Sequence, residues 1–223
     1  MMKAREFFIG LLALLLLAPA NIQKGEFANA ALKEMGKSAS FEQAQGAIVF
    51  TNGADCLEWQ QHEQVLLYPC RDAAAFSWRS PADWQVRQVV TGDLNRDGVV
   101  EFGLLVWRPF APWPIDKYQP YAGRIAAFHN EEGLSCHFIL IGRDGAGYRE
   151  LWAGSALADP ISDLSVADYD RDGVEELLAI EGTYASPGHG NLTAWRWQGF
   201  GFSLVERVPG DFRHYTLSDF LDR

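Results

Sequence analysis

The sequence lacks most of the motifs by which common enzyme classes are recognised. No HExxH metalloprotease motif occurs, and the histidines are scattered: His62, His129, His137, His189 and His214. No GxSxG nucleophile elbow is present, because Gly154-Ser155 lacks the required spacing. We therefore predict a protein that is not an enzyme. The alternative hypothesis is an extracytoplasmic hydrolase that acts on glycans through two carboxylates, since a pair that meets only in the folded chain has no signature in the sequence.

Basic residues are in the minority. The chain has 19 Lys and Arg against 29 Asp and Glu, which gives a formal net charge of −10. Such a surface does not attract nucleic acid or anionic lipid through general electrostatics, so we predict no nucleic-acid partner. Low-complexity tracts are also missing and 13% of the residues are aromatic, which favours a folded domain over disorder.

Long apolar runs are missing except for one near the start. The run at 7–17 is shorter than the ~20 residues that a membrane helix needs, so we predict no stable membrane insertion. Basic residues precede this run and the small-residue segment at 18–20 follows it, a pattern typical of a secretory signal peptide. We expect residues 1–20 to be cleaved, with cleavage after Ala30 as the alternative, and the mature protein to be secreted or periplasmic.

The most informative feature that is present is an acidic loop that occurs twice. Its copies run from Asp93 to Glu101 (DLNRDGVVE) and from Asp168 to Glu176 (DYDRDGVEE). Oxygens at positions 1, 3 and 5 converge on one ion when such a loop curls around it, and Gly at position 6 permits the turn. A carbonyl at position 7 and a carboxylate at position 9 complete the cage. The predicted metal ligands are Asp93, Asn95, Asp97, Val99, Glu101, Asp168, Asp170, Asp172, Val174 and Glu176.

Hard oxygen donors of this kind favour calcium, which we predict as the cofactor in a structural role. Carboxylates ~4 Å apart repel by ~1 kcal/mol per pair even in water, so this crowding requires a cation. We expect weaker binding in the first loop, because Asn95 stands where the second loop has Asp170. EF-hand and dockerin loops need an acidic residue at position 12. This chain has Leu104 and Ala179 there, so neither motif fits.

The rest of the chain has a β-strand pattern. Residues 21–45 are predicted as a flexible or partly helical leader, and residues 46–223 as one all-β domain. Turn residues flanked by apolar runs predict three hairpins. Strands are also predicted on both sides of each acidic loop. The hairpins are expected at 56–68, 137–152 and 192–207, and the flanking strands at 86–92, 102–107, 161–167 and 177–180.

The two loops and their hairpins resemble the FG-GAP (VCBS-type) repeats that form the blades of integrin α-subunit propellers and of many exported bacterial proteins. DLNRDGVVE and DYDRDGVEE look like the calcium loops of such blades, and LTAWRWQGFGFSLVER looks like their outer strands. The resemblance covers about residues 55–208 and implies β-propeller blades. With about three blade-like units, the chain implies a short or incomplete propeller. An open arc, a sandwich-like variant and closure by self-association are the alternatives.

The chain has three cysteines. In an exported protein, Cys56 and Cys70 bracket the first hairpin, and we predict a disulfide between them. Cys136 is expected to be buried and unpaired, with pairing between two chains as the alternative.

Recognition is expected at the end of the blades opposite the acidic loops. The links 108–124 and 181–191 emerge there, and rigid aromatic loops suit contacts with carbohydrate or protein. The alternative is that these aromatics fold back over the blade cores. The candidate ligand-binding residues are Phe110, Trp113, Tyr118, Tyr121, Tyr184 and His189. We therefore predict an exported calcium-binding protein that acts in binding or scaffolding.

Overall fold

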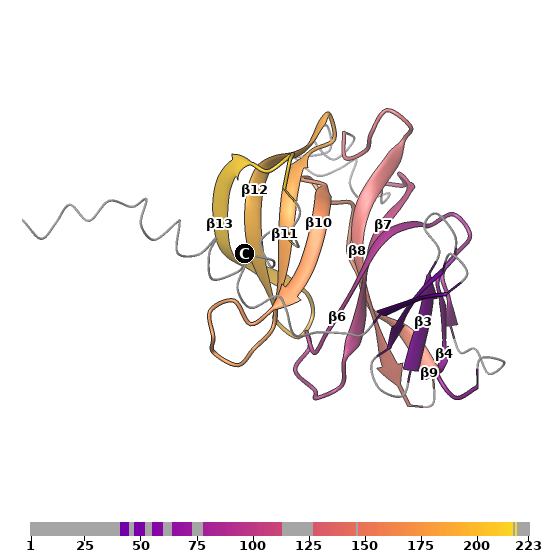
Figure 1. Ribbon diagram of the computed structural model, residues 1–223. Helices are drawn as coiled ribbons and strands as arrows, with labels where there is room; N and C mark the ends of the chain where they lie inside the picture. Colours follow the sequence, from indigo (N-terminus) through magenta and orange to yellow (C-terminus); the bar gives the residue numbers. More distant parts are fainter. Residues whose placement is uncertain are drawn as a thin grey trace, which may run out of the picture.

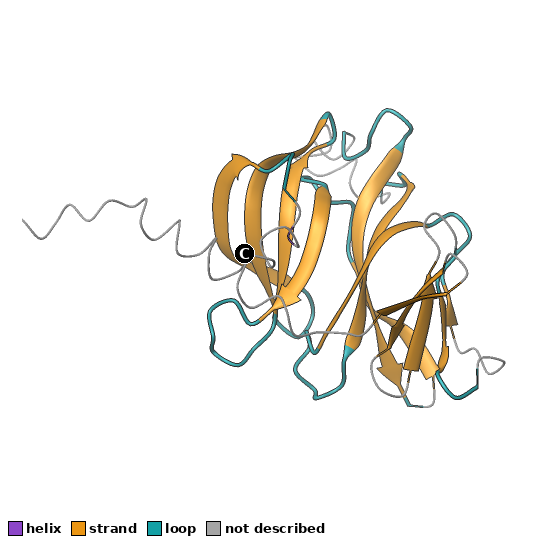
Figure 2. Ribbon diagram, in the orientation of Figure 1, coloured by secondary structure: helices purple, strands orange, loops and turns teal. Residues whose placement is uncertain are grey.

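The structure is a computed structural model that describes residues 41–44, 47–51, 55–59, 64–72, 78–112, 127–145, 147–215 and 217. In this part of the chain, strands joined by loops form three antiparallel sheets, so the all-β prediction is confirmed (Figure 2). No helix among the described residues has the length and apolar character that crossing a membrane requires.

Each sheet follows the chain order of its strands, so every strand pairs with its neighbours in sequence. Sheet A contains β1 (Phe41–Ala44), β2 (Ala47–Thr51), β3 (Asp55–Trp59), β4 (Leu66–Pro69) and β5 (Trp78–Arg79). Sheet B contains β6 (Gln85–Gly92), β7 (Glu101–Pro109), β8 (Leu134–Asp144) and β9 (Gly147–Ala153). Sheet C contains β10 (Ile161–Ala167), β11 (Glu176–Thr183), β12 (Ser186–Trp197) and β13 (Phe202–Asp211).

Sheet B lies between the other two sheets, and the pattern of β7 explains why (Figure 1). Alternate residues of a strand point to opposite faces. Phe102, Leu104 and Val106 enter the core shared with sheet A, whereas Leu105 and Trp107 enter the core shared with sheet C. All five are buried. An unbroken apolar run is therefore required in β7, because neither face of this strand meets water.

Strand β11 repeats this arrangement in sheet C. Leu177 and Ala179 face sheet B, while Leu178 and Ile180 belong to a separate cluster on the far face. Leu217, near the end of the chain, is buried in that same cluster. Full burial of each such Leu or Ile side chain contributes ~1.5–3 kcal/mol. The stacked sheets are thus held together mainly by their central strands.

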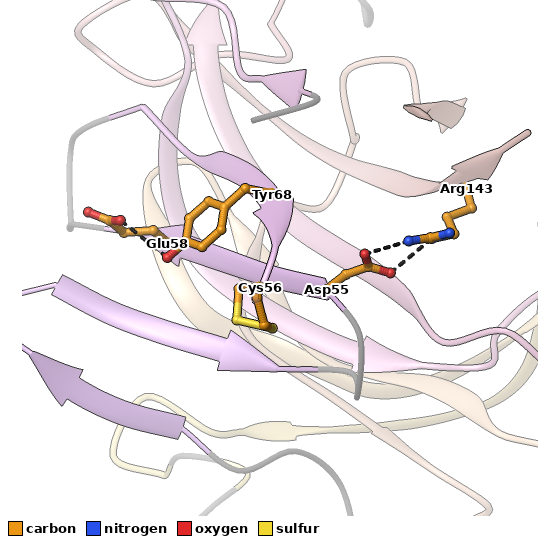
Figure 3. Close-up of a disulfide and its surroundings, with 6 residues drawn as sticks. Asp55, Cys56, Glu58, Tyr68 and Arg143 are labelled. Atoms are coloured by element: carbon orange, nitrogen blue, oxygen red, sulfur yellow. Dashed lines mark hydrogen bonds and ion pairs between the residues drawn. A yellow bond between two sulfur atoms is a disulfide. The ribbon is translucent and has the colours of Figure 1, made fainter. Parts of the chain in front are cut away.

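Polar contacts also join the sheets. Arg143 on β8 makes two hydrogen bonds to the carboxylate of Asp55 on β3, at 2.6 and 2.9 Å, which links sheet B to sheet A (Figure 3). Beside this pair, the predicted disulfide between Cys56 and Cys70 is confirmed and closes the base of the β3–β4 hairpin. Cys136 is buried, as predicted, and forms no disulfide within the described part of the chain.

Two boundaries differ from the sequence-based prediction. The first strand begins at Phe41, ahead of the predicted domain start at residue 46, so the end of the expected leader belongs to sheet A. The link predicted at 181–191 is instead a strand hairpin, in which Thr183 pairs with Ser186. Gly182 and Gly190 make this pairing possible, because a Cβ on either residue would lie within 2.7 Å of the neighbouring backbone. The predicted signal peptide at 1–20 and the predicted leader up to residue 40 lie outside the described residues.

Candidate metal centres

The two acidic loops occupy equivalent places in sheets B and C. The first loop, residues 93–100, joins β6 to β7, and the second loop, residues 168–175, joins β10 to β11. Both lie at the same end of the stacked sheets, at the bottom of Figure 1. The strands that precede them, β6 and β10, contact each other. The repeat seen in the sequence is therefore a repeat in space.

The backbones of the two loops match. Arg96 and Arg171, at position 4, have φ values of 66° and 62°, and Gly98 and Gly173, at position 6, have φ values of 82° and 87°. A side chain at either glycine would meet nothing within 4 Å. Glycine is thus needed at position 6 for its positive φ and not for lack of space.

In the first loop, side-chain oxygens are turned inward by the backbone. The amide nitrogen of Gly98 donates to Asp93 Oδ2 at 3.0 Å, and that of Val99 donates to Asp97 Oδ1 at 2.8 Å. Asn95 lies beside them, since its Oδ1 accepts from the Asp97 nitrogen at 2.8 Å. One carboxylate oxygen each from Asp93, Asp97 and Glu101 lies within 4.8 Å of the others, so the three can hold a metal ion.

Glu101 lies at the bottom of this first cluster. The residue is only 1% exposed, and its Oε2 accepts a hydrogen bond from the backbone nitrogen of Asn95 at 3.3 Å. Burial raises the pKa of Glu101 to about 8, and the nearby charges of Asp97 and Asp93 act in the same direction. Without a cation the ionised form of this carboxyl is therefore unfavourable in the folded protein.

The second loop brings together Asp168, Asp170 and Glu176, again with one oxygen each within 4.8 Å of the others. Gly173 and Val174 donate to Asp168 Oδ2 and to Asp172 Oδ1, both at 2.9 Å, as their counterparts do in the first loop. Within the described chain, Asp168 Oδ1 and Glu176 Oε2 are buried and accept no hydrogen bond. Buried carboxylate oxygens without a donor are costly unless a cation lies beside them.

Arg196 on β12 also reaches the second cluster. Its Nε donates to Glu176 Oε1 at 2.6 Å, and its Nη2 lies 2.9 Å from Asp170 Oδ2 and 3.0 Å from Asp172 Oδ2. The guanidinium thus contacts one oxygen of each of these three carboxylates and does not contact the second oxygen of any of them. Burial raises the pKa of Glu176 to about 7, while Arg196 acts in the opposite direction.

Among the described residues, the position beside the first cluster that corresponds to Arg196 is not an arginine. Phe102 pairs with Ile141 and Leu177 pairs with Trp195, so one further step of each register sets Gly142 opposite Glu101 and Arg196 opposite Glu176. A Cβ on Gly142 would lie 2.3 Å from Leu151 Cδ1, which leaves no room for a side chain.

These differences balance the charge of the two sites. The three proposed carboxylate ligands of the first site have a formal charge of −3. The four proposed carboxylate ligands of the second site together with Arg196 give −4 + 1 = −3, where Glu175 is not counted because it is not a proposed ligand. The prediction of weaker binding in the first loop rested on Asn95 standing in place of Asp170. The contact between Arg196 and Asp170 removes that difference in net charge.

The candidate ligand-binding residues take different positions. Trp113, Tyr118 and Tyr121 lie outside the described residues. Phe110 is half-buried and its ring centroid lies 5.3 Å from that of His129. His189 is exposed and its Nδ1 lies 3.7 Å from a carboxylate oxygen of Asp211. Tyr184 packs edge-on against Trp107, and its hydroxyl donates to the Leu157 carbonyl at 2.8 Å.

No family model matches the chain, and no curated protein matches it. Among solved structures, the chain matches the crystal structure of a "putative exo-beta-1,3-galactanase" from Bifidobacterium bifidum S17, with a TM-score of 0.37 and 11% identity. The match covers 74% of this chain and 52% of that one, so this chain spans about half the length of that protein. A TM-score this low assigns neither a fold nor an activity.

Proposed function

We propose that the protein is an exported, calcium-binding repeat protein of the FG-GAP type that acts in binding or scaffolding. The observation that supports calcium most directly is the Glu176 side chain, which is 0% exposed and has an oxygen without a hydrogen-bond donor among the described residues. That oxygen belongs to a cluster of carboxylates, the donors that calcium prefers over thiolate or imidazole. Calcium here is structural: it offsets the repulsion within each loop and fixes the connection between the first two strands of a sheet.

We further propose that sheets B and C are propeller blades and that sheet A is a third, blade-like unit. Each of sheets B and C is a four-stranded antiparallel sheet in chain order, with an acidic loop between its first two strands, and this supports the assignment. A chain with about three such units forms a short propeller. Sedimentation of the purified protein tests this: a monomer at micromolar concentration supports an open arc, and a dimer supports closure by self-association.

Recognition of a protein or carbohydrate partner is assigned to the end opposite the acidic loops. Phe110 supports this, because it follows β7 at that end and is half-buried beside His129. A glycan array run beside a panel of hydrolase substrates separates the two hypotheses. Binding without turnover supports recognition, whereas turnover that survives alanine substitution of the loop acids supports the hydrolase alternative.

Thermal unfolding with and without calcium tests the calcium assignment. At a calcium concentration about 100 times Kd, each occupied site adds ~2.7 kcal/mol of stability, which raises Tm by roughly 5–10 °C in a chain of this size. The double variant Asp168→Ala/Asp170→Ala should lose the share contributed by the second loop. The control Glu131→Ala/Glu132→Ala removes two exposed carboxylates at the other end of sheet B and should keep the full response. An unchanged calcium response in the loop variant rejects the second site.

A further inference from the structure

The two acidic loops are joined by a direct hydrogen bond. Glu175, on the second loop, accepts from the backbone nitrogen of Asp93 through its Oε2 at 2.7 Å. Asp93 is the first ligand of the first loop, and Glu175 stands between the proposed ligands Val174 and Glu176 of the second loop. The equivalent of Glu175 in the first loop is Val100, which has no carboxylate. The second loop therefore contacts the first through Glu175, but the first loop has no equivalent carboxylate with which to make the same contact.

Gly92 makes this contact possible. A Cβ at this residue would lie 2.8 Å from Glu175 Oε2 and 2.4 Å from Val166 Cγ1. Any larger residue would force the side chains of Glu175 and Val166 to shift and so disturb the hydrogen bond to the Asp93 nitrogen. The absence of a side chain at position 92 thus fits a close approach between the two loops.

A second hydrogen bond joins the first loop to sheet C. Arg96, at position 4 of the first loop, donates from Nη2 to the carbonyl oxygen of Trp197 at 2.9 Å. Trp197 directly follows Arg196, whose guanidinium contacts the second cluster. Within the strands that precede the loops, the Gln88 amide donates to Asp163 Oδ1 at 2.7 Å and so holds β6 against β10.

We propose that these contacts couple the two loops, so that calcium in one loop strengthens binding in the other. This rests on the proposed calcium function. An ion in the second loop fixes Val174 and Glu176 on both sides of Glu175 and so holds the acceptor at the Asp93 nitrogen. Asp93, the first ligand of the first loop, is then already ordered, so calcium binding to the first loop loses less conformational entropy. By linkage, an ion in the first loop strengthens the second by the same factor.

Electrostatic repulsion between the two ions opposes this effect. Counting only the proposed carboxylate ligands and Arg196, each site has a formal charge of −3, and one calcium leaves it at −3 + 2 = −1. The first ion therefore lowers the attraction of the pair of sites for the second ion but does not reverse it. At physiological salt the Debye length is ~8 Å, which further weakens repulsion between exposed charges.

Calcium titration calorimetry on the full chain tests the coupling, with the second loop blocked or intact in the unaltered protein and in three single-substitution backgrounds. Blocking the second loop with Asp168→Ala/Asp170→Ala should weaken calcium binding in the first loop about threefold to tenfold. In a Glu175→Ala background the same block should change the first-loop Kd by less than twofold. Glu175→Gln retains an oxygen acceptor and should keep most of the coupling. Glu131→Ala, an exposed carboxylate at the far end, should leave the coupling intact.

The outcomes separate the coupling from calcium binding itself. If the first loop binds calcium with the same Kd whether or not the second is blocked, the coupling is refuted and the calcium function stands. If the coupling survives Glu175→Ala, Glu175 is not the link. If neither loop binds calcium in folded protein, the proposed function and the coupling are both refuted. Thermal unfolding of each variant shows that it is folded before titration.

Discussion

Arg196→Met is expected to destabilise the calcium-free protein much more than the calcium-loaded protein. The guanidinium supplies the positive charge beside Glu176, Asp170 and Asp172 when no metal is bound. Methionine keeps an apolar stem of similar length, so the substitution removes the charge and the hydrogen bonds with little loss of packing. When calcium is present, the ion supplies the missing positive charge.

The magnitude follows from the exposure of the partners. Removal of one partner from a buried ion pair costs ~3–5 kcal/mol. Glu176 is fully buried, but the side chains of Asp170 and Asp172 are 34% and 42% exposed, so their contacts contribute little. Protonation of Glu176, whose pKa is about 7, also limits the loss. We expect ~2 kcal/mol, which lowers Tm by roughly 4–8 °C in a protein of this size.

Circular dichroism melting in EGTA and in millimolar calcium measures this difference. The control Arg149→Met breaks an exposed ion pair with Asp144 and should shift Tm by about 1 °C or less in both conditions. An equal loss of stability for Arg196→Met in the two conditions would refute the reasoning, because the arginine would then act without reference to a metal. No loss in EGTA would refute it as well.

Three further predictions concern single features of the fold. The folded pKa of Glu101, about 8, lies above its ordinary value of 4.5, so calcium-free protein loses stability as pH rises from 4.5 to 8. In urea titrations over this pH range, the variant Glu101→Gln should lose a few kcal/mol less stability than the unaltered protein. Burial lowers the pKa of His137 to about 4, so stability present above pH 6.5 is lost as pH falls toward 4, and His137→Gln should flatten that part of the acid unfolding curve. Cys56→Ala/Cys70→Ala opens a loop with a sequence separation of 14 and should reduce the free energy of unfolding by ~3 kcal/mol, measured in guanidinium.

Local patterns in the sequence predicted much of the fold. The strands on both sides of each acidic loop lie where short apolar runs and β-forming residues placed them, and the three hairpins are present. The disulfide followed from two cysteines that bracket one hairpin. The three carboxylates that meet in each cluster are among the ligands that the repeated spacing of Asp and Gly predicted. These features depend on residues that are close in sequence, which is why the sequence alone was sufficient.

Contacts between distant residues could not be predicted in this way. Arg196 meets Glu176 because of the β11–β12 register, and no motif marks that arginine. Glu175 meets Asp93 because β6 and β10 lie side by side. The hairpin at 181–191 was missed for the opposite reason: its glycines favour a loop locally, while close backbone approach makes them suitable for a strand pair.

Calcium stoichiometry is the most direct test of the account. Purified, folded protein should be dialysed against millimolar calcium at low background, and the bound metal counted by elemental analysis. The account predicts two ions per chain, and one ion per chain for a variant with either loop blocked. Folded protein that retains no calcium in either loop would contradict the central claim.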